Sequence, residues 1–120
     1  TPNVLLIYLL GKIAEDLNRK GRSTIQEETK QKAKMLYDYM EYSALFQPAV
    51  KENQHRSATV AVADCKIDSA LVVDRMRQKN LIIGPGYGAK KESQIRIANF
   101  PATSFDEMET LVDALKELEP

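Results

Sequence analysis

The sequence predicts a two-layer α+β domain in which a small antiparallel or mixed sheet carries its helices on one face. Three observations lead to this fold class. Apolar residues recur at helical spacing in four segments, short β-branched runs lie between the later segments, and glycine or capping signals separate them. The expected order is α-α-β-α-β-β-α. The 120 residues suit a single domain with one modest core.

The first expected helix covers Val4–Arg19 and ends before Gly21. Its apolar surface extends around almost the whole first two turns, which suits a helix buried between two bodies. The chain starts at Thr1 without an initiator Met and runs almost at once into this helix. We therefore expect a piece of a larger protein, in which residues 1–21 form a connecting helix that packs on a large domain absent here.

A capping-box pattern of Thr24 and Glu27 predicts the start of a second helix over Ile25–Tyr42. The small, β-branched run Ala58–Ala63 predicts a strand. A third helix is expected over Ile67–Lys79, with Asn80 as its left-handed stop. The residues expected on the core face of the second helix are Ile25, Thr29, Ala33, Leu36 and Met40.

Two short strands are expected at Leu81–Ile83 and Gln94–Phe100, with the loop Gly84–Gly88 between them. The length of this connection suits a hairpin, so we expect the two strands to pair antiparallel. Ser104 with Glu107 forms a second capping box. It opens a final amphipathic helix, whose apolar face comprises Phe105, Met108, Leu111, Leu115 and Leu118.

Composition narrows the possible functions. The 17 basic and 17 acidic residues cancel, which argues against a nucleic-acid binder. The longest apolar run, Val4–Leu10, is too short to span a bilayer, and no basic region precedes it as in a signal peptide. Cys65 is the only cysteine, which fits a reducing cytoplasm and predicts a small buried residue.

Arg96 is the sharpest candidate for a binding residue. Alternation along its strand places Ile95, Ile97 and Asn99 on one face and Arg96 on the other. A guanidinium on that face can bind a carboxylate through two parallel hydrogen bonds, but it can also lie in solvent or pair with a structural acid. The residue pattern alone leaves these interpretations open.

The glycine loop Gly84–Gly88 permits close approach of the backbone to a ligand, or simply forms a hairpin turn. Lys90 and Lys91 follow it and can recognise a phosphate as point charges, unless they are merely solvated. His55 is the only histidine, which excludes a metal site built on several histidines, and we expect it to be structural. No metal motif, catalytic triad or carboxylate dyad appears, so we nominate no catalytic residue.

In their order and spacing, these features resemble the C-terminal portion of the phosphoserine aminotransferases, a class V, fold-type I family that depends on pyridoxal phosphate. The resemblance runs over essentially the whole chain. It rests on Thr1-Pro2 before a long apolar helix, the pair Arg56-Ser57 before a strand, and the glycine loop after Leu81–Ile83. It closes with Arg96 on the next strand and the final amphipathic helix.

The resemblance implies a cytoplasmic homodimer with each cofactor between subunits. Thr1 would offer its hydroxyl to the cofactor phosphate of the neighbouring subunit, and Arg96 would hold the α-carboxylate of the amino-acid or keto-acid substrate. The intact enzyme would transfer the amino group of glutamate to 3-phosphohydroxypyruvate in serine biosynthesis. The Schiff-base lysine would lie in the N-terminal large domain, so this fragment alone should be inactive and should not hold pyridoxal phosphate.

The chain departs from the family pattern at the expected phosphate pocket. Many members carry a His-Arg pair seven and six residues before the carboxylate arginine, where this chain has Ala89 and Lys90. Lys90, with Lys91, can replace the charge but not the bidentate geometry. This departure allows another class V transaminase, of the serine–pyruvate or alanine–glyoxylate type. From a different functional class, a non-catalytic regulatory module that binds an amino acid through the glycine loop and Arg96 also remains an alternative.

Overall fold

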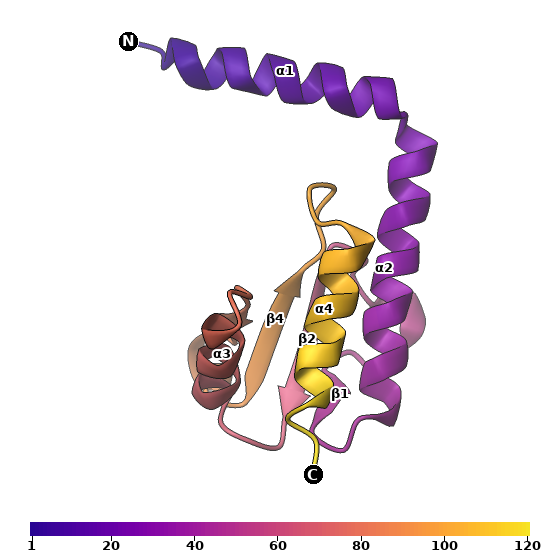
Figure 1. Cartoon of the computed structure of the whole chain (residues 1–120), viewed down its shortest axis with the longest axis vertical. Helices are drawn as coiled ribbons and strands as arrows, with labels where there is room; N and C mark the ends of the chain where they lie inside the picture. Colours follow the sequence, from indigo (N-terminus) through magenta and orange to yellow (C-terminus); the bar gives the residue numbers. More distant parts are fainter.

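A computed structural model describes all residues of the chain, Thr1–Pro120. Its helices are α1 (Val4–Lys20), α2 (Arg22–Tyr42), α3 (Ser69–Gln78) and α4 (Phe105–Lys116). Its strands are β1 (Phe46–Pro48), β2 (Val60–Cys65), β3 (Gly84–Pro85) and β4 (Gln94–Ala98). Two short 3-10 turns are η1 (Asn53–His55) and η2 (Gly88–Lys90). The four helices and the small antiparallel sheet confirm the predicted α+β class (Figure 1).

A single residue, Gly21, joins α1 to α2 and turns the chain sharply between them (Figure 1). Its φ of 90° lies in a region that residues with a Cβ rarely adopt, which explains glycine at this corner. The expected capping box of Thr24 and Glu27 is wrong. Because α2 already begins at Arg22, both residues lie inside the helix, and Gly21 has no side chain to cap it.

The sheet has the order β1-β2-β4-β3, and every neighbouring pair is antiparallel. The antiparallel pairing of the last two strands is therefore confirmed, and β2 lies beside β4. Strand β1 is not predicted from the sequence, so the observed order contains one strand more than expected. This strand is only three residues long and ends in Pro48, which a sheet tolerates at its edge.

The expected strand at Leu81–Ile83 is also wrong, because the chain pairs with β4 only at Gly84 and Pro85. Leu81 instead closes α3, since its N–H donates to the Met76 carbonyl at 2.9 Å. Asn80 has φ 60°, which confirms the left-handed stop predicted there. The loop that follows is correspondingly shorter than expected, and Gly88 already opens η2.

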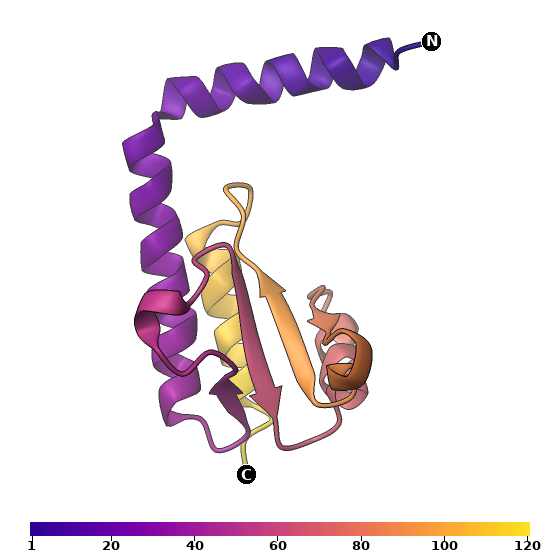
Figure 2. The ribbon, with the colours of Figure 1, turned by 180° about the vertical axis from the view of Figure 1, so that it is seen from behind.

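One hydrophobic core joins α2, α3 and α4 to the same face of the sheet. In Figure 1 α4 lies in front of the strands, and in Figure 2, seen from behind, β2 and β4 lie in front of α4. Ile95 and Ile97 are buried on the helix-covered face, as their alternation predicted. The helices contribute to this cluster Leu36, Met40, Val72, Met76, Met108, Leu111, Val112, Ala114 and Leu115.

Buried polar contacts fix the connection that leads from β4 into α4. The Asn99 side-chain amide donates to the carbonyls of Thr29 (2.9 Å) and Ala58 (2.8 Å), which ties α2 to the sheet. Lys32 is buried, and its Nζ donates to the Thr103 carbonyl at 2.5 Å. Burial lowers the pKa of this ammonium. Immediately afterwards α4 opens with the predicted capping box of Ser104 and Glu107.

Helix α1 extends away from this core (Figures 1 and 2). None of its residues is buried, although its sequence is strongly apolar. The apolar side chains that it exposes are Val4, Leu5, Leu6, Ile7, Tyr8, Leu9, Leu10, Ile13 and Leu17. None of the helices has the combination of length and hydropathy needed to cross a bilayer.

Candidate functional site

Arg96 lies at the middle of β4, between β2 on one side and β3 on the other. It pairs with Val62 across the first ladder and with Gly84 across the second. Because Ile95 and Ile97 on either side are buried among the helices, Arg96 must emerge on the opposite face of the sheet. There its side chain is half-buried. The packing of β4 therefore determines which way the guanidinium projects.

Three neighbours in the glycine loop hold this guanidinium. Its Nε donates a hydrogen bond of 2.7 Å to the Pro85 carbonyl. Its Cζ lies 3.7 Å from the centre of the Tyr87 ring, within the range of a cation–π contact. It also passes over Gly84, where an added Cβ would lie only 3.1 Å from Nη2. The loop thus supplies the Pro85 carbonyl, the Tyr87 ring and, at Gly84, the space that a side chain would otherwise occupy.

The terminal nitrogens of Arg96 have no hydrogen-bond partner within the chain. Arg96 takes part in none of the ion pairs, and its single hydrogen bond uses Nε. The nearby carboxylate of Asp64 instead accepts from the Gln94 amide at 2.8 Å. A half-buried guanidinium with both terminal nitrogens free is suited to an anion from outside the chain.

Arg56 provides an internal comparison, because it too lies over a tyrosine ring. Its Cζ is 5.1 Å from the centre of the Tyr37 ring. Its Nε donates to the Val50 carbonyl, and its Nη2 both donates to the Lys51 carbonyl and pairs with Glu41 at 2.6 Å. Arg56 is thus a structural arginine whose bonding groups are used internally. Arg96 lies closer to its tyrosine ring, at 3.7 Å, but lacks the internal anion.

Close backbone packing gives the glycine loop its shape. A Cβ on Gly86 would lie 2.1 Å from the Lys90 carbonyl oxygen, so only glycine fits where η2 folds back. Gly88 has φ 52°, in the left-handed region that glycine favours. The loop is therefore a hairpin turn, as one of its two interpretations from the sequence predicted, and it also brings its backbone close to Arg96.

Lys90 and Lys91 are exposed at the end of this loop. Neither ammonium makes an ion pair within the chain. Lys90 is the last residue of η2, and its backbone carbonyl packs against Gly86. Lys91 lines a separate surface cavity of about 690 Å³ beside the start of α3, together with Arg77. The lysines are thus close to the Arg96 loop in the chain but do not contact the guanidinium.

Thr1 is exposed at the free end of α1, far from the sheet (Figure 1). Asn3, not Thr1, caps the helix, because its Oδ1 accepts the Leu6 N–H at 3.1 Å. The Thr1 hydroxyl makes no hydrogen bond to the chain. Thr1 and Arg96 therefore do not form one site within a single copy of this chain.

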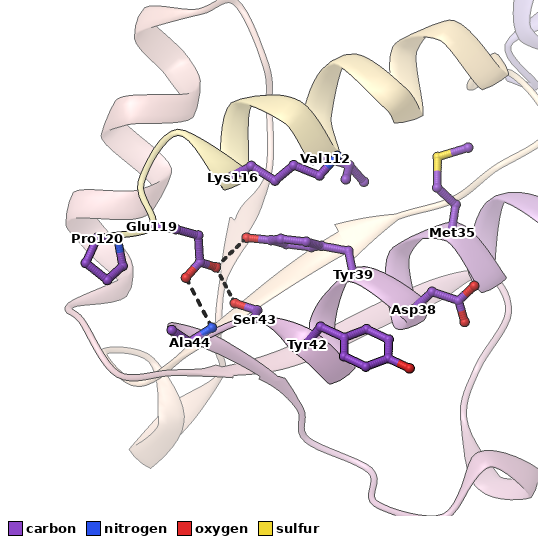
Figure 3. Close-up of a pocket in the computed structure, with 10 residues that line it drawn as sticks. All are labelled: Met35, Asp38, Tyr39, Tyr42, Ser43, Ala44, Val112, Lys116, Glu119 and Pro120. Atoms are coloured by element: carbon purple, nitrogen blue, oxygen red, sulfur yellow. Dashed lines mark hydrogen bonds between the residues drawn. The ribbon is translucent and has the colours of Figure 1, made fainter.

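The pocket in Figure 3 lies between α2, α4 and the C-terminal residues, with a volume of about 600 Å³. Several of its polar groups bond to Glu119. Glu119 accepts from the hydroxyls of Ser43 and Tyr39, the latter at 2.9 Å, and from the Ala44 N–H at 3.1 Å. None of the residues proposed from the sequence lines it. These bonds attach the end of the chain to α2, so we assign the cluster a structural role.

Two further residues considered from the sequence take no part in the site. His55 lies in η1 and is exposed, 3.3 Å from the Glu52 carboxylate. Cys65 is a free thiol and only half-buried, so the expectation of a buried residue is corrected. Its position at the end of β2 leaves one side open, although burial still raises the pKa of the thiol to about 11. No group of His, Cys, Asp or Glu side chains lies together as a metal site.

Arg96 was predicted as a site residue from the sequence, whereas its neighbours Tyr87 and Gly84 were not. No pattern in the sequence connects either residue with Arg96, because that connection needs the hairpin register, which places Gly84 opposite Arg96. The incorrect strand at Leu81–Ile83 concealed that register. Only the observed pairing of Gly84 with Arg96 reveals it.

Comparison with known proteins identifies relatives over almost the whole chain. The family model for aminotransferase class-V matches residues 1–101. The phosphoserine aminotransferase of Rhodococcus opacus (strain B4) is 29% identical over 118 residues, covering 96% of this chain and 32% of that protein. The chain therefore spans about a third of the length of the relative.

Solved structures extend the comparison. A phosphoserine aminotransferase from Cytophaga hutchinsonii superposes with a TM-score of 0.94 at 38% identity, over 98% of this chain and 33% of that one. The alanine–glyoxylate aminotransferase of Nostoc sp. has a TM-score of 0.85 at 18% identity, over 98% and 32% of the two chains, a similarity of fold. With the matched family model, these relatives establish that the chain belongs to the aminotransferase class-V family.

Proposed function

We propose that this chain is the small C-terminal domain of a phosphoserine aminotransferase. The intact enzyme would convert glutamate and 3-phosphohydroxypyruvate to 2-oxoglutarate and 3-phosphoserine, in serine biosynthesis. Two observations support this substrate pair: the 38% identity with the Cytophaga hutchinsonii phosphoserine aminotransferase over 98% of the chain, and the match to the Rhodococcus opacus enzyme. The domain's own contribution would be to bind the substrate carboxylate.

The free guanidinium of Arg96 carries this proposal. Its Nε is occupied by the Pro85 carbonyl and one face by the Tyr87 ring, so the edge that bears the terminal nitrogens is the part left to bind a ligand. A carboxylate meets such an edge through two parallel hydrogen bonds, which fix orientation as well as charge. Arg96 would thereby hold the substrate while the reacting carbon is placed at the cofactor.

Lys90, with Lys91 as its neighbour, would supply positive charge for the substrate phosphate. Support comes from their exposed, unpaired ammonium groups at the end of the loop that holds Arg96. An ammonium is a point charge, so it would attract the dianionic phosphate without the two-point geometry of an arginine. Recognition of the phosphate would therefore depend more strongly on ionic strength than recognition of the carboxylate.

Pyridoxal phosphate would be the cofactor, and when bound it would supply the electron sink for the reaction. Within this chain, Thr1 would hold it by donating its hydroxyl to the phosphate in the neighbouring subunit. The exposed Thr1 side chain, free of internal hydrogen bonds at the far end of α1, fits one such contact. The Schiff-base lysine would lie in the large domain, so this fragment by itself should be inactive.

The assembly that this role requires is a cytoplasmic homodimer in which α1 packs on the large domain. The exposed apolar side chains over the first turns of α1 support this packing, because such a surface is stable when another apolar surface covers it. Because this chain spans only about a third of the length of its relatives, a large domain would account for the remainder. Small amino and keto acids, but no nucleic acid or membrane, would be its other partners.

An assay of the full-length protein that contains this chain tests the proposal. We expect 2-oxoglutarate to form from glutamate and 3-phosphohydroxypyruvate, and 3-phosphoserine to compete better than serine or alanine. Because this chain has Ala89 and Lys90 where the family resemblance implies a His-Arg pair, another class V specificity is the second candidate. Preferential use of alanine with glyoxylate, or of serine with pyruvate, would support it. Absence of any amino-group transfer would contradict both.

A further inference from the structure

Tyr87 has no role in the function proposed so far, yet its position is specific. Its side chain is 74% exposed although it is a large aromatic residue. The one defined contact of its ring is with the Arg96 guanidinium, 3.7 Å away. It makes no hydrogen bond through its hydroxyl. An exposed tyrosine that contacts only an arginine does not contribute to the core, so a different reason for its position is required.

The contacts of Arg96 provide that reason. An arginine side chain has several rotatable bonds, and a free guanidinium would lose much conformational freedom on binding a carboxylate. The bond from Nε to the Pro85 carbonyl fixes one point of the group but still permits it to tilt. A ring stacked on its face restricts that tilt, while the edge that bears the terminal nitrogens stays open.

Gly84 completes the arrangement on the neighbouring strand. It lies directly opposite Arg96 in the β3–β4 register, and a Cβ there would meet Nη2 at 3.1 Å. The backbone of Gly84 has no positive φ, so glycine is not needed there for its conformation. Because Gly84 has no side chain, the Arg96 guanidinium has room to pack beside the Tyr87 ring.

We propose that Tyr87 is a positioning residue, which holds the plane of the Arg96 guanidinium so that both terminal nitrogens meet the substrate carboxylate together. This inference rests on the proposed function, because it acts through Arg96. The aromatic ring, and not the hydroxyl, performs the role. Tyr87 touches Arg96 and not the reacting atoms, so its loss weakens substrate binding more than the chemical step.

Tyr37 offers a control, since Arg56 Cζ lies 5.1 Å from the centre of its ring, although its hydroxyl also donates to the Ser57 carbonyl at 2.9 Å. Arg56 is held by carbonyls and by Glu41, so loss of that stacking should not affect a substrate. Comparison of Tyr87→Leu with Tyr37→Leu therefore separates a general cost of removing a stacked tyrosine from a specific effect on Arg96. Tyr87→Phe keeps the ring and removes only the hydroxyl.

The test uses steady-state kinetics of the full-length protein, with glutamate and 3-phosphohydroxypyruvate varied in turn, and thermal unfolding of each variant. For Tyr87→Leu we expect KM for both substrates to rise about two- to fivefold, the range of a cation–π contact at an exposed site, while kcat stays within about twofold. Tyr87→Phe should restore KM to near the wild-type value. Tyr37→Leu should change the unfolding temperature but not KM.

Each other outcome has a distinct meaning. If Arg96→Ala raises KM but Tyr87→Leu does not, the positioning role is wrong and the proposed function stands. If Arg96→Ala leaves both KM values unchanged, the proposed function fails and the inference fails with it. If Tyr87→Phe is as impaired as Tyr87→Leu, the hydroxyl acts on the substrate itself, which overturns positioning by the ring. If Tyr87→Leu lowers the unfolding temperature but leaves KM unchanged, Tyr87 is only structural, which overturns the positioning role.

Discussion

Gly84 lies opposite Arg96 across the β3–β4 ladder, with so little space between them that a single added carbon would meet Nη2 at 3.1 Å. The first prediction follows from this distance. Gly84→Ala should shift the guanidinium by a few tenths of an ångström without breaking the strand, because the conflict is with the end of a flexible side chain. We expect kcat/KM for carboxylate substrates to fall severalfold, with an unfolding temperature close to wild type.

Gly86→Ala, in contrast to Gly84→Ala, should lower the stability of the protein. A Cβ at this position would meet the Lys90 carbonyl oxygen at 2.1 Å, so backbone has to move and η2 cannot fold back as observed. We expect a loss of stability of about 2 kcal/mol, in the range typical of steric conflict in a packed region. Equilibrium unfolding in denaturant measures it. A stability equal to that of Gly84→Ala would contradict this account of the loop.

Lys90→Ala should distinguish phosphorylated from unphosphorylated substrates. Because the Lys90 ammonium is exposed, its contribution to phosphate binding should be modest, with a rise in KM for 3-phosphohydroxypyruvate of about fivefold. The corresponding rise for an unphosphorylated keto acid should be smaller, and added salt should reduce the difference. Lys91→Ala serves as the neighbouring control. An equal effect of Lys90→Ala on both kinds of substrate would exclude Lys90 from the phosphate site.

The carboxylate of Glu119 should make the stability of the protein depend on pH. Its burial raises the pKa, but hydrogen bonds from Ser43, Tyr39 and backbone N–H groups outweigh this and hold the pKa of Glu119 below its usual 4.5 (Figure 3). Since the folded pKa is the lower one, the stabilisation is present above pH 4.5 and is lost as pH falls through the folded value.

Glu119→Gln tests that dependence. We expect the substitution to cost about 1 kcal/mol at neutral pH, as for a partly exposed carboxylate with several donors. The difference between the two proteins should vanish in acid, where Glu119 is protonated. Unfolding free energies measured between pH 3 and pH 7, roughly the window around the carboxyl pKa, give the comparison. A difference that persists unchanged at low pH would show that the charge is not responsible.

The apolar surface of α1 should make the isolated 120-residue chain associate with itself. All of the core cluster lies after Gly21, so a chain starting at Arg22 should keep its fold and sediment as a monomer. Analytical ultracentrifugation of the two chains tests this. Monomeric behaviour of the 120-residue chain at micromolar concentration would mean that α1 does not need the covering surface proposed for it.

The parts of the fold that sequence reasoning predicted correctly depend on local periodicity. Ile95 and Ile97 alternate with Arg96, so their burial fixes the direction of the arginine, as expected. The capping box of Ser104 and Glu107 is likewise a local pattern, and it forms as predicted. The residue that the site proposal most depends on was therefore accessible from the sequence.

The incorrect elements depend on contacts between distant segments. The sequence predicts that a strand begins at Leu81. In the structure the Leu81 N–H donates to the Met76 carbonyl, so this residue belongs to the end of α3. Strand β1 has too few residues for any periodicity, and it exists because Phe46 is buried beside β2. Tyr87 could not be connected with Arg96 before the hairpin register was known. Such features follow from tertiary pairing and not from spacing along the chain.

The central claim is that the free edge of the Arg96 guanidinium binds the substrate carboxylate, and one measurement tests it most directly. We would determine kcat/KM of the full-length protein and of Arg96→Ala with glutamate and 3-phosphohydroxypyruvate. Loss of two charge-assisted hydrogen bonds predicts a fall of at least about 100-fold, with no comparable loss of thermal stability. A value of kcat/KM near that of the wild type would contradict the account.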